Sequence, residues 1–268
     1  MDSLFTQDDQ APVTPFSSYT PRVAIVTGGA QGLGYAISNR LADDGIDIAV
    51  NDIASKQDQI NSVVEELRKK GRRAIAVPGD VSSEADVIAI TEKTVKELGS
   101  VDIMVANAGI ARLCSFLQTS VDTYDSVLGI NARGVFMCFK YAALQMIKQG
   151  RGGRLIAASS IMGKQGSQNL TAYCASKFAV RGIVQTAAIE LRRHGITVNA
   201  YAPGRIQTGI STGVAVDTKQ RDLVLGLLAN APNGEPENVA SLVSYLAKPE
   251  SHFINGQAIT ADGGFRFD

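Results

Sequence analysis

Short apolar runs rich in β-branched residues alternate along the chain with longer segments whose apolar residues recur every three or four positions. The first pattern is typical of buried strands and the second of amphipathic helices. Strands that alternate with helices in this way predict one parallel sheet with helices on both faces. We expect strands at about 23–27, 46–51, 73–77, 102–106, 154–158, 196–200 and 257–261, and helices at about 58–70, 84–98, 122–149 and 173–194.

Glycines separate the first predicted strand from the helix after it, in the run Thr-Gly-Gly-Ala-Gln-Gly-Leu-Gly at 27–34. Glycine lets the backbone approach a ligand closely, and a helix N-terminus offers free N–H groups and a positive dipole end to a diphosphate. A glycine-rich run alone is weak evidence of a nucleotide site, because a chain with 26 glycines gives such matches by chance. Its place between a strand and a helix is typical of a dinucleotide site. The pattern therefore predicts a single-domain, Rossmann-type α/β fold, a doubly wound parallel sheet of about seven strands.

Asp52 ends the second predicted strand and follows the glycines at close to the roughly 20 residues expected for the acidic residue of such domains. A carboxylate there accepts hydrogen bonds from a ribose hydroxyl and repels a 2′-phosphate, which favours NAD over NADP. Two alternatives stay open, because Asp52 could simply cap the next helix and Lys56 could approach a 2′-phosphate. NAD is the predicted cofactor, and NADP stays an alternative.

Tyr173 and Lys177 are separated by one turn of a predicted helix and therefore share a face. A phenol with its usual pKa of about 10 is a poor base at neutral pH, and a nearby cation lowers that pKa. Ser160 follows the fifth predicted strand and could hold a carbonyl or alcohol oxygen. A Tyr-x-x-x-Lys pair alone is more typical of an amphipathic surface. Together with the nucleotide motifs, the three residues predict a proton-transfer site for carbonyl and alcohol chemistry.

Further motifs follow these in a fixed order. They are Asn-Ala-Gly at 107–109, Asn131, Pro203-Gly204 and Asp262-Gly263-Gly264. With them, residues 21–268 resemble the short-chain dehydrogenase/reductase family, and the stretches 176–182, 195–201 and 243–247 look most like its acetoin/diacetyl (2,3-butanediol) reductases. Ile161 departs from those reductases, in which a polar residue is expected after the serine. The segment at 208–232 also looks shorter than theirs, and both departures put a small vicinal diol in doubt and allow a bulkier, more apolar ketone or secondary alcohol.

The resemblance implies an oxidoreductase that transfers a hydride between a nicotinamide cofactor and a ketone or secondary alcohol. It implies that Tyr173 is the acid/base, that Ser160 orients the substrate oxygen, and that Lys177 lowers the tyrosine pKa and binds the nicotinamide ribose. Asn131 would hold a water that links Lys177 to solvent, although it could be an ordinary polar residue. The residues implied in cofactor binding are Gly28, Gly32, Leu33, Gly34, Asp52, Asp80, Val81, Asn107, Ala108, Gly109, Tyr173, Lys177, Pro203, Gly204, Ile206 and Thr208.

The substrate pocket is expected among residues near 110–116, 161–170 and 208–232, and the last segment is typical of a mobile lid. Two other functions stay open. One is a reductase of carrier-bound 3-oxoacyl chains, which should prefer NADPH and need a basic docking patch. The other is a dinucleotide-sensing protein without turnover, which would not need Ser160, Tyr173, Lys177 or Asn131.

The composition of the chain indicates which binding partners and which cellular location to expect. A chain of 268 residues with 45% hydrophobic content can bury the core of one domain. Its 26 basic and 26 acidic residues give no sign of a nucleic-acid or anionic-membrane partner, and no uninterrupted apolar run reaches a membrane span of ~18 residues. The cysteines lack metal-ligand spacing and fit a reducing, cytoplasmic location. Residues 1–20 predict a disordered arm before the catalytic domain at 21–268, and family analogy implies a homo-tetramer.

Overall fold

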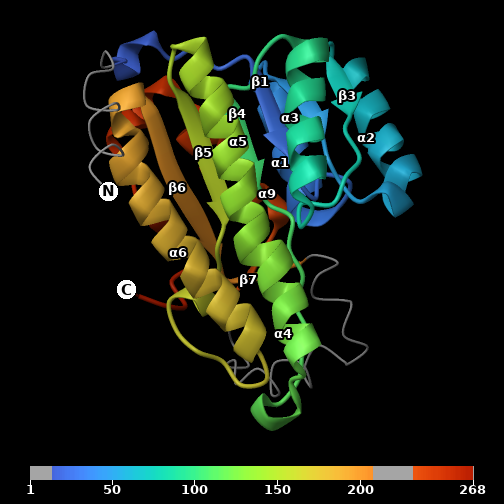
Figure 1. The fold of residues 1–268 in the computed structure, drawn as a ribbon, viewed down its shortest axis with the longest axis vertical. Helices are drawn as coiled ribbons and strands as arrows, with labels where there is room; N and C mark the ends of the chain where they lie inside the picture. Colours follow the sequence, from blue (N-terminus) through green and yellow to red (C-terminus); the bar gives the residue numbers. More distant parts are fainter. Residues whose placement is uncertain (1–13, 208–231, 268) are drawn as a thin grey trace.

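A seven-stranded parallel sheet forms the centre of the fold (Figure 1). The computed structural model describes residues 14–207 and 232–267. The strand order β3-β2-β1-β4-β5-β6-β9 places the topological switch point between β1 and β4. This arrangement confirms the predicted doubly wound α/β fold. The strands are β1 (Val23–Val26), β2 (Asp47–Val50), β3 (Ala74–Ala76), β4 (Ile103–Ala106), β5 (Gly153–Ala158), β6 (Ile196–Pro203) and β9 (Ala258–Ala261).

Helices cover both faces of this sheet. In Figure 1, α3, α5 and α6 lie on the face toward the viewer, and α1 and α9 lie behind the strands. Successive residues of β1 alternate between the two cores, with Val23 and Ile25 in one and Ala24 and Val26 in the other. Burial on both faces explains why the strands are continuous apolar runs. The helices of this framework are α1 (Gly32–Asp43), α2 (Gln57–Lys69), α3 (Glu84–Leu98), α4 (Val121–Leu128), α5 (Gly134–Gln149), α6 (Thr171–Leu191) and α9 (Pro236–Ala247).

The single helix expected at 122–149 is interrupted in the structure. A π-helical turn at Gly129–Arg133 separates α4 from α5. The whole stretch Val121–Gln149 has the length and apolar composition of a membrane span, although 56% of its most apolar window is buried inside the protein. The sequence was expected to contain no uninterrupted apolar run long enough to span a membrane, and Val121–Gln149 is not such a run. Its apolar character appears only as an average over the segment, which also contains polar residues. Its packing is that of a core helix.

The last residues of the predicted N-terminal arm pack against the domain. Tyr19 is buried, and its hydroxyl donates a hydrogen bond of 2.9 Å to the carbonyl of Ala247. The guanidinium of Arg154 lies 3.8 Å from the centroid of the Tyr19 ring. The prediction of a disordered arm over residues 1–20 is therefore wrong at Tyr19, and residues 1–13 of that arm lie outside the described residues.

Candidate active site

A cavity of about 560 Å³ opens at the carboxyl edge of the sheet, the lower edge in Figure 1. Parallel strands end at a common edge, which brings together segments that are far apart in the sequence. Two predicted residues, Gly34 and Asn131, are buried beside the lining, and Thr208 lies outside the described residues. The predicted site residues that line the cavity are Gly28, Gly32, Leu33, Asp52, Asp80, Val81, Asn107, Ala108, Gly109, Ser160, Tyr173, Lys177, Pro203, Gly204 and Ile206.

The glycine-rich loop between β1 and α1 has no room for side chains. Gly28 has a φ of +63°, a region that favours glycine. A Cβ on Gly34 would lie 2.1 Å from the carbonyl oxygen of Gly28, so this position requires glycine. The cap residue of α1, Gln31, makes no side-chain hydrogen bond to the first turn, which leaves backbone N–H groups there available to an anion. The loop therefore fits the diphosphate of a dinucleotide.

Two carboxylates line the adenosine end expected for that ligand. Asp52 accepts hydrogen bonds from the N–H groups of Ile53 at 2.9 Å and Ala30 at 3.3 Å, and it pairs with Lys56 at 3.3 Å. Lys56 also lines the cavity, so both predicted determinants of cofactor choice face the same space. Asp80 accepts the N–H of Ser82 at 2.8 Å, a hydrogen bond typical of a turn.

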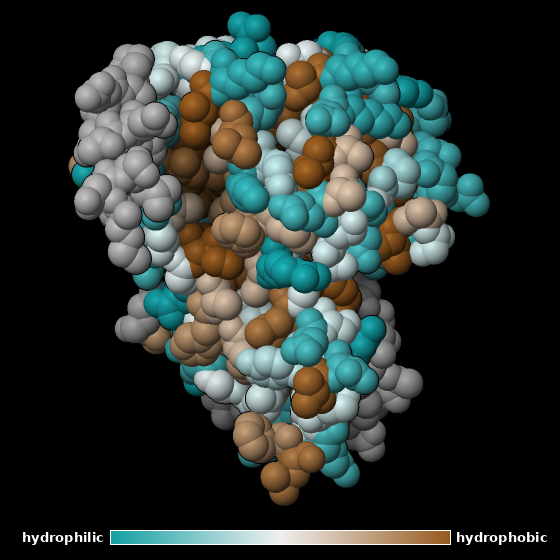
Figure 2. Space-filling model, in the orientation of Figure 1, coloured by the Kyte–Doolittle hydropathy of each residue, from teal (hydrophilic) through white to brown (hydrophobic). Residues whose placement is uncertain are grey.

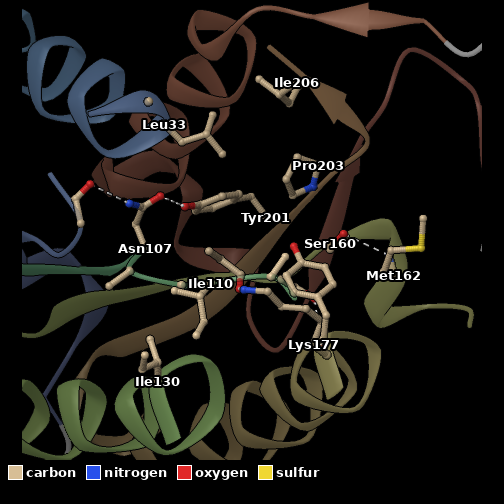
Figure 3. Close-up of a pocket in the computed structure, with 18 of the residues that line it drawn as sticks. Leu33, Asn107, Ile110, Ile130, Ser160, Met162, Lys177, Tyr201, Pro203 and Ile206 are labelled. Carbon is tan, nitrogen blue, oxygen red and sulfur yellow. Dashed lines mark hydrogen bonds between the residues drawn. The ribbon is translucent and has the colours of Figure 1, made fainter. Parts of the chain in front are cut away.

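Asn107 joins the loops after β1 and β4 to the end of β6. Its side-chain amide donates to the carbonyl of Thr27 at 2.8 Å, and its oxygen accepts the hydroxyl of Tyr201 at 2.8 Å (Figure 3). The hydroxyl of Thr27 accepts the N–H groups of Asn107 and Ala108 at 2.9 and 3.0 Å. Burial raises the pKa of Tyr201, so its hydroxyl stays a donor. The network fixes the strand ends that frame the cavity.

Asn131 lies within the π-helical turn and is completely buried. Its amide donates to the carbonyl of Ile110 at 2.8 Å and to the hydroxyl of Ser176 at 3.1 Å, and its oxygen accepts the N–H of Ile110 at 2.9 Å. A Cβ built on Gly109 would lie 3.2 Å from the Asn131 oxygen and 3.6 Å from the ammonium of Lys177. Asn131 therefore connects the loop after β4 to α6, beside Lys177.

Ser160, Tyr173 and Lys177 meet at the other end of the cavity (Figure 3). The ammonium of Lys177 donates to the carbonyl of Ala158 at 2.8 Å and lies 5.4 Å from the centroid of the Tyr173 ring. The hydroxyl of Ser160 accepts the N–H of Met162 at 3.1 Å. The end of β5 and the first turns of α6 thus deliver a hydroxyl, a phenol and an ammonium to one place, as the sequence predicts.

The electrostatics of this group differ from the expectation. Burial raises the pKa of Tyr173, and a hydrogen bond with Ser160 only partly offsets that rise. Lys177 was expected to lower the pKa of Tyr173, and no such lowering is seen. Burial lowers the pKa of Lys177 itself, to about 8. Enclosure in protein disfavours the charged form of each group. At neutral pH the arrangement favours a protonated phenol beside a mostly protonated ammonium.

Comparisons with known proteins settle the family. The family model described as enoyl-(acyl carrier protein) reductase matches residues 28–266. The chain is 48% identical over 244 residues to the short-chain dehydrogenase/reductase eriH of Hericium erinaceus, which covers 90% of this chain and 96% of that relative. The chain belongs to the short-chain dehydrogenase/reductase family. Members of this family use NAD(H) or NADP(H), and the chain is an oxidoreductase by this membership.

Two other relatives support the predicted place within the family. The L-2,3-butanediol dehydrogenase of Corynebacterium glutamicum is 36% identical over 263 residues, which covers 92% of this chain and 99% of that enzyme. The crystal structure of a short-chain type dehydrogenase/reductase from Mycobacterium marinum has a TM-score of 0.85 at 30% identity and covers 94% of this chain and 98% of the other. The resemblance to short-chain dehydrogenases/reductases is therefore confirmed over nearly the whole chain.

Sequence reasoning missed several residues that line this short-chain dehydrogenase/reductase cavity, and two of them carry aromatic rings. Tyr201 lines it from the end of β6, and Phe265 lines it from the C-terminal turn. Asp262 forms that turn by accepting the N–H groups of Gly264 at 3.0 Å, Phe265 at 3.3 Å and Arg266 at 2.7 Å. The Asp-Gly-Gly motif signals the turn, but the sequence alone does not show that the turn carries an aromatic ring into the cavity.

Proposed function

We propose that the chain is an NAD-dependent ketone reductase and secondary-alcohol dehydrogenase whose acid/base is Tyr173. The observation that carries this proposal is that Ser160, Tyr173 and Lys177 share one cavity with a glycine-rich loop that fits a diphosphate. A sensor of dinucleotides has no need of a phenol, a hydroxyl and a buried ammonium at the far end of the cofactor cavity. The arrangement therefore favours turnover over sensing.

When bound, the reduced nicotinamide supplies a hydride, one hydrogen with two electrons, to the carbonyl carbon. Negative charge then develops on the carbonyl oxygen, where the hydroxyls of Ser160 and Tyr173 donate hydrogen bonds that stabilise it. Tyr173 gives its proton to that oxygen, which completes the alcohol, and the phenolate regains a proton from solvent. Such acid/base assistance contributes about 10²–10⁴-fold to the rate. Oxidation of the alcohol reverses these steps.

The pKa directions suit the reductive direction at neutral pH. A phenol whose pKa is raised by burial remains protonated and ready to donate. The ammonium of Lys177 stabilises the phenolate that remains after the transfer. Asn131 holds the loop beside Lys177, and we keep as part of this proposal its role in a proton path from Lys177 to solvent.

NAD is the proposed cofactor because Asp52 lines the cavity at the end of β2. Its pairing with Lys56 at 3.3 Å lowers its repulsion of a 2′-phosphate. Fluorescence titration with NADH and NADPH in parallel tests the proposed cofactor. Tighter binding of NADH supports the role of Asp52, whereas tighter binding of NADPH contradicts it and assigns Lys56 to the 2′-phosphate.

The assembly and location are also proposals. Apolar side chains are exposed on the outer surface of α5 and α6, where brown patches are visible in Figure 2. They include Phe136, Leu144 and Ile147 of α5 and Phe178 and Ile189 of α6. We infer that this face contacts other copies of the chain in a cytoplasmic homo-tetramer. Sedimentation of the native protein and of Leu144→Lys tests this, and a native protein that stays monomeric at micromolar concentration contradicts it.

The proposed chemistry is tested by Tyr173→Phe, which removes only the phenolic hydroxyl. The variant should lose at least about 10²-fold in the kcat/KM of ketone reduction while it binds NADH as the native enzyme does. Tyr245→Phe is the matched control, because Tyr245 is 45% exposed on α9. Full reduction by Tyr173→Phe contradicts the proposal.

A further inference from the structure

Apolar side chains wall the end of the cavity that contains Ser160 and Tyr173. Ile161, Met162 and Leu170 are each at most 6% exposed and belong to one packed cluster. Leu113 and Phe265 pack against that cluster and also line the cavity. We call these five residues the apolar wall.

Backbone hydrogen bonds hold this apolar wall in place. The N–H of Cys114 donates to the carbonyl of Asn169 at 2.9 Å, and a parallel bridge joins Cys114 to Leu170. The segments that carry Leu113 and Leu170 are therefore tied to each other. The carboxylate of Asp262 fixes the turn that carries Phe265. The apolar wall is thus built by the fold before a substrate arrives.

Within residues 14–207 and 232–267, the apolar wall offers a second substrate oxygen no side-chain hydrogen-bond partner. None of its five side chains carries an oxygen or nitrogen, and Ser160 and Tyr173 are committed to the reacting oxygen. Arg112 and Ser126 also line the cavity, and both are exposed to water. The half-buried Arg205 lines it from beyond the end of β6. A hydroxyl or carbonyl placed against the apolar wall would lose its water without a replacement. A small hydroxyketone therefore gains little there, whereas a hydrocarbon body gains from burial.

We propose that the substrate is a ketone or secondary alcohol with an apolar body next to the reacting carbon, and that Phe265 is a specificity-determining residue for that body. This inference rests on the proposed function of the same site. It differs from what the name of the butanediol relative would suggest, since 2,3-butanediol is small and carries two oxygens.

The test compares kcat/KM for acetoin, diacetyl, cyclohexanone and the bicyclic ketone tetralone, with NADH and with NADPH. Each methylene in an apolar pocket contributes about tenfold or more to such discrimination. We expect tetralone to exceed acetoin and diacetyl by at least about 10²-fold. Phe265→Ala should lower kcat/KM for tetralone at least about tenfold, mainly through KM, and change cyclohexanone by less than about threefold. Phe253→Ala is the control, because Phe253 is 94% exposed.

Tyr173→Phe separates the two ways in which this can fail. Reduction of acetoin or diacetyl that matches or exceeds that of tetralone, and that Tyr173→Phe abolishes, overturns the inference and leaves the proposed function intact. Reduction that survives in Tyr173→Phe, or no reduction of any ketone, overturns both. An equal loss with tetralone and cyclohexanone in Phe265→Ala overturns the role of Phe265.

Discussion

Lys177→Met should make the protein more stable at neutral pH while it removes activity. Lys177 is a buried cation whose ammonium donates to the carbonyl of Ala158, and no ion pair to it occurs among residues 14–207 and 232–267. Burial lowers its pKa from 10.5 to about 8. At 1.36 kcal/mol per pKa unit, charge on this residue costs the folded state about 3 kcal/mol at pH 7. Methionine has a similar shape without the charge.

The lost hydrogen bond to Ala158 offsets part of this gain, by about 1.5 kcal/mol, because its donor is charged. The net expectation is a free energy of unfolding about 2 kcal/mol higher in Lys177→Met. For a chain of this size that corresponds to a rise in Tm of about 4–8 °C. The kcat/KM of ketone reduction should fall at least about 10²-fold in the same variant, because the phenolate would lose its cation.

The stability difference should depend on pH with a definite sign. The unfolded lysine keeps its proton up to about pH 10.5, and the folded one loses it above about pH 8. The cost is therefore complete below pH 8 and disappears as pH rises toward 10.5. Native protein should approach the stability of Lys177→Met over that window.

Urea unfolding at several pH values and one fixed protein concentration measures this effect. Lys148→Met is the control, because Lys148 is exposed on α5 and its substitution should change stability by less than about 0.5 kcal/mol. A Lys177→Met variant that is less stable than native protein at pH 7 refutes the reasoning. So does a stability difference that does not change between pH 8 and pH 10.

Other predictions concern the cofactor end of the cavity and the pH profile. Asp52→Asn should weaken NADH binding about tenfold in a fluorescence titration, and unchanged NADH affinity would contradict its contact with the ribose. Tyr201→Phe removes a hydrogen bond but keeps the ring, so the KM for NADH should rise severalfold with little change in kcat; a fall in kcat alone would contradict this positioning role. Gly34→Ala should abolish dinucleotide binding, because its Cβ would lie 2.1 Å from a backbone oxygen, whereas Gly182→Ala, with no atom within 4 Å of its Cβ, should bind normally. The kcat/KM of ketone reduction should be flat near neutral pH and fall above about pH 8 as Lys177 loses its proton, and a rise over that range would contradict the mechanism.

The fold could be predicted because the central strands of the sheet are buried on both faces. Such strands are apolar without interruption, as in Ile103–Ala106, and that pattern is local. The π-helical turn at Gly129–Arg133 was not predicted, since a shift in backbone hydrogen bonds leaves the apolar spacing of the sequence nearly unchanged. The helix α9 was also missed. Its last residues, 243–247, were used only for the family resemblance, and no helix was predicted there.

The candidate site was predictable where its residues stand at strand ends or on one helix face. Asp52, Ser160 and Tyr173 are such residues, and the shared carboxyl edge brings them to one cavity. Phe265 could not be predicted, because its position depends on how the C-terminal turn packs against distant loops. The pKa of Tyr173 could not be predicted either, since its direction depends on enclosure that only the folded structure shows.

The central claim is that Tyr173 supports hydride transfer from a nicotinamide to a ketone in this cavity. The most direct test uses NADH that carries deuterium at both hydrogens of the reactive nicotinamide carbon, followed by mass spectrometry of the alcohol product. The account predicts one deuterium at the carbinol carbon with native enzyme, and almost no labelled product with Tyr173→Phe. Product without deuterium, or labelled product formed at the native rate by Tyr173→Phe, would contradict it.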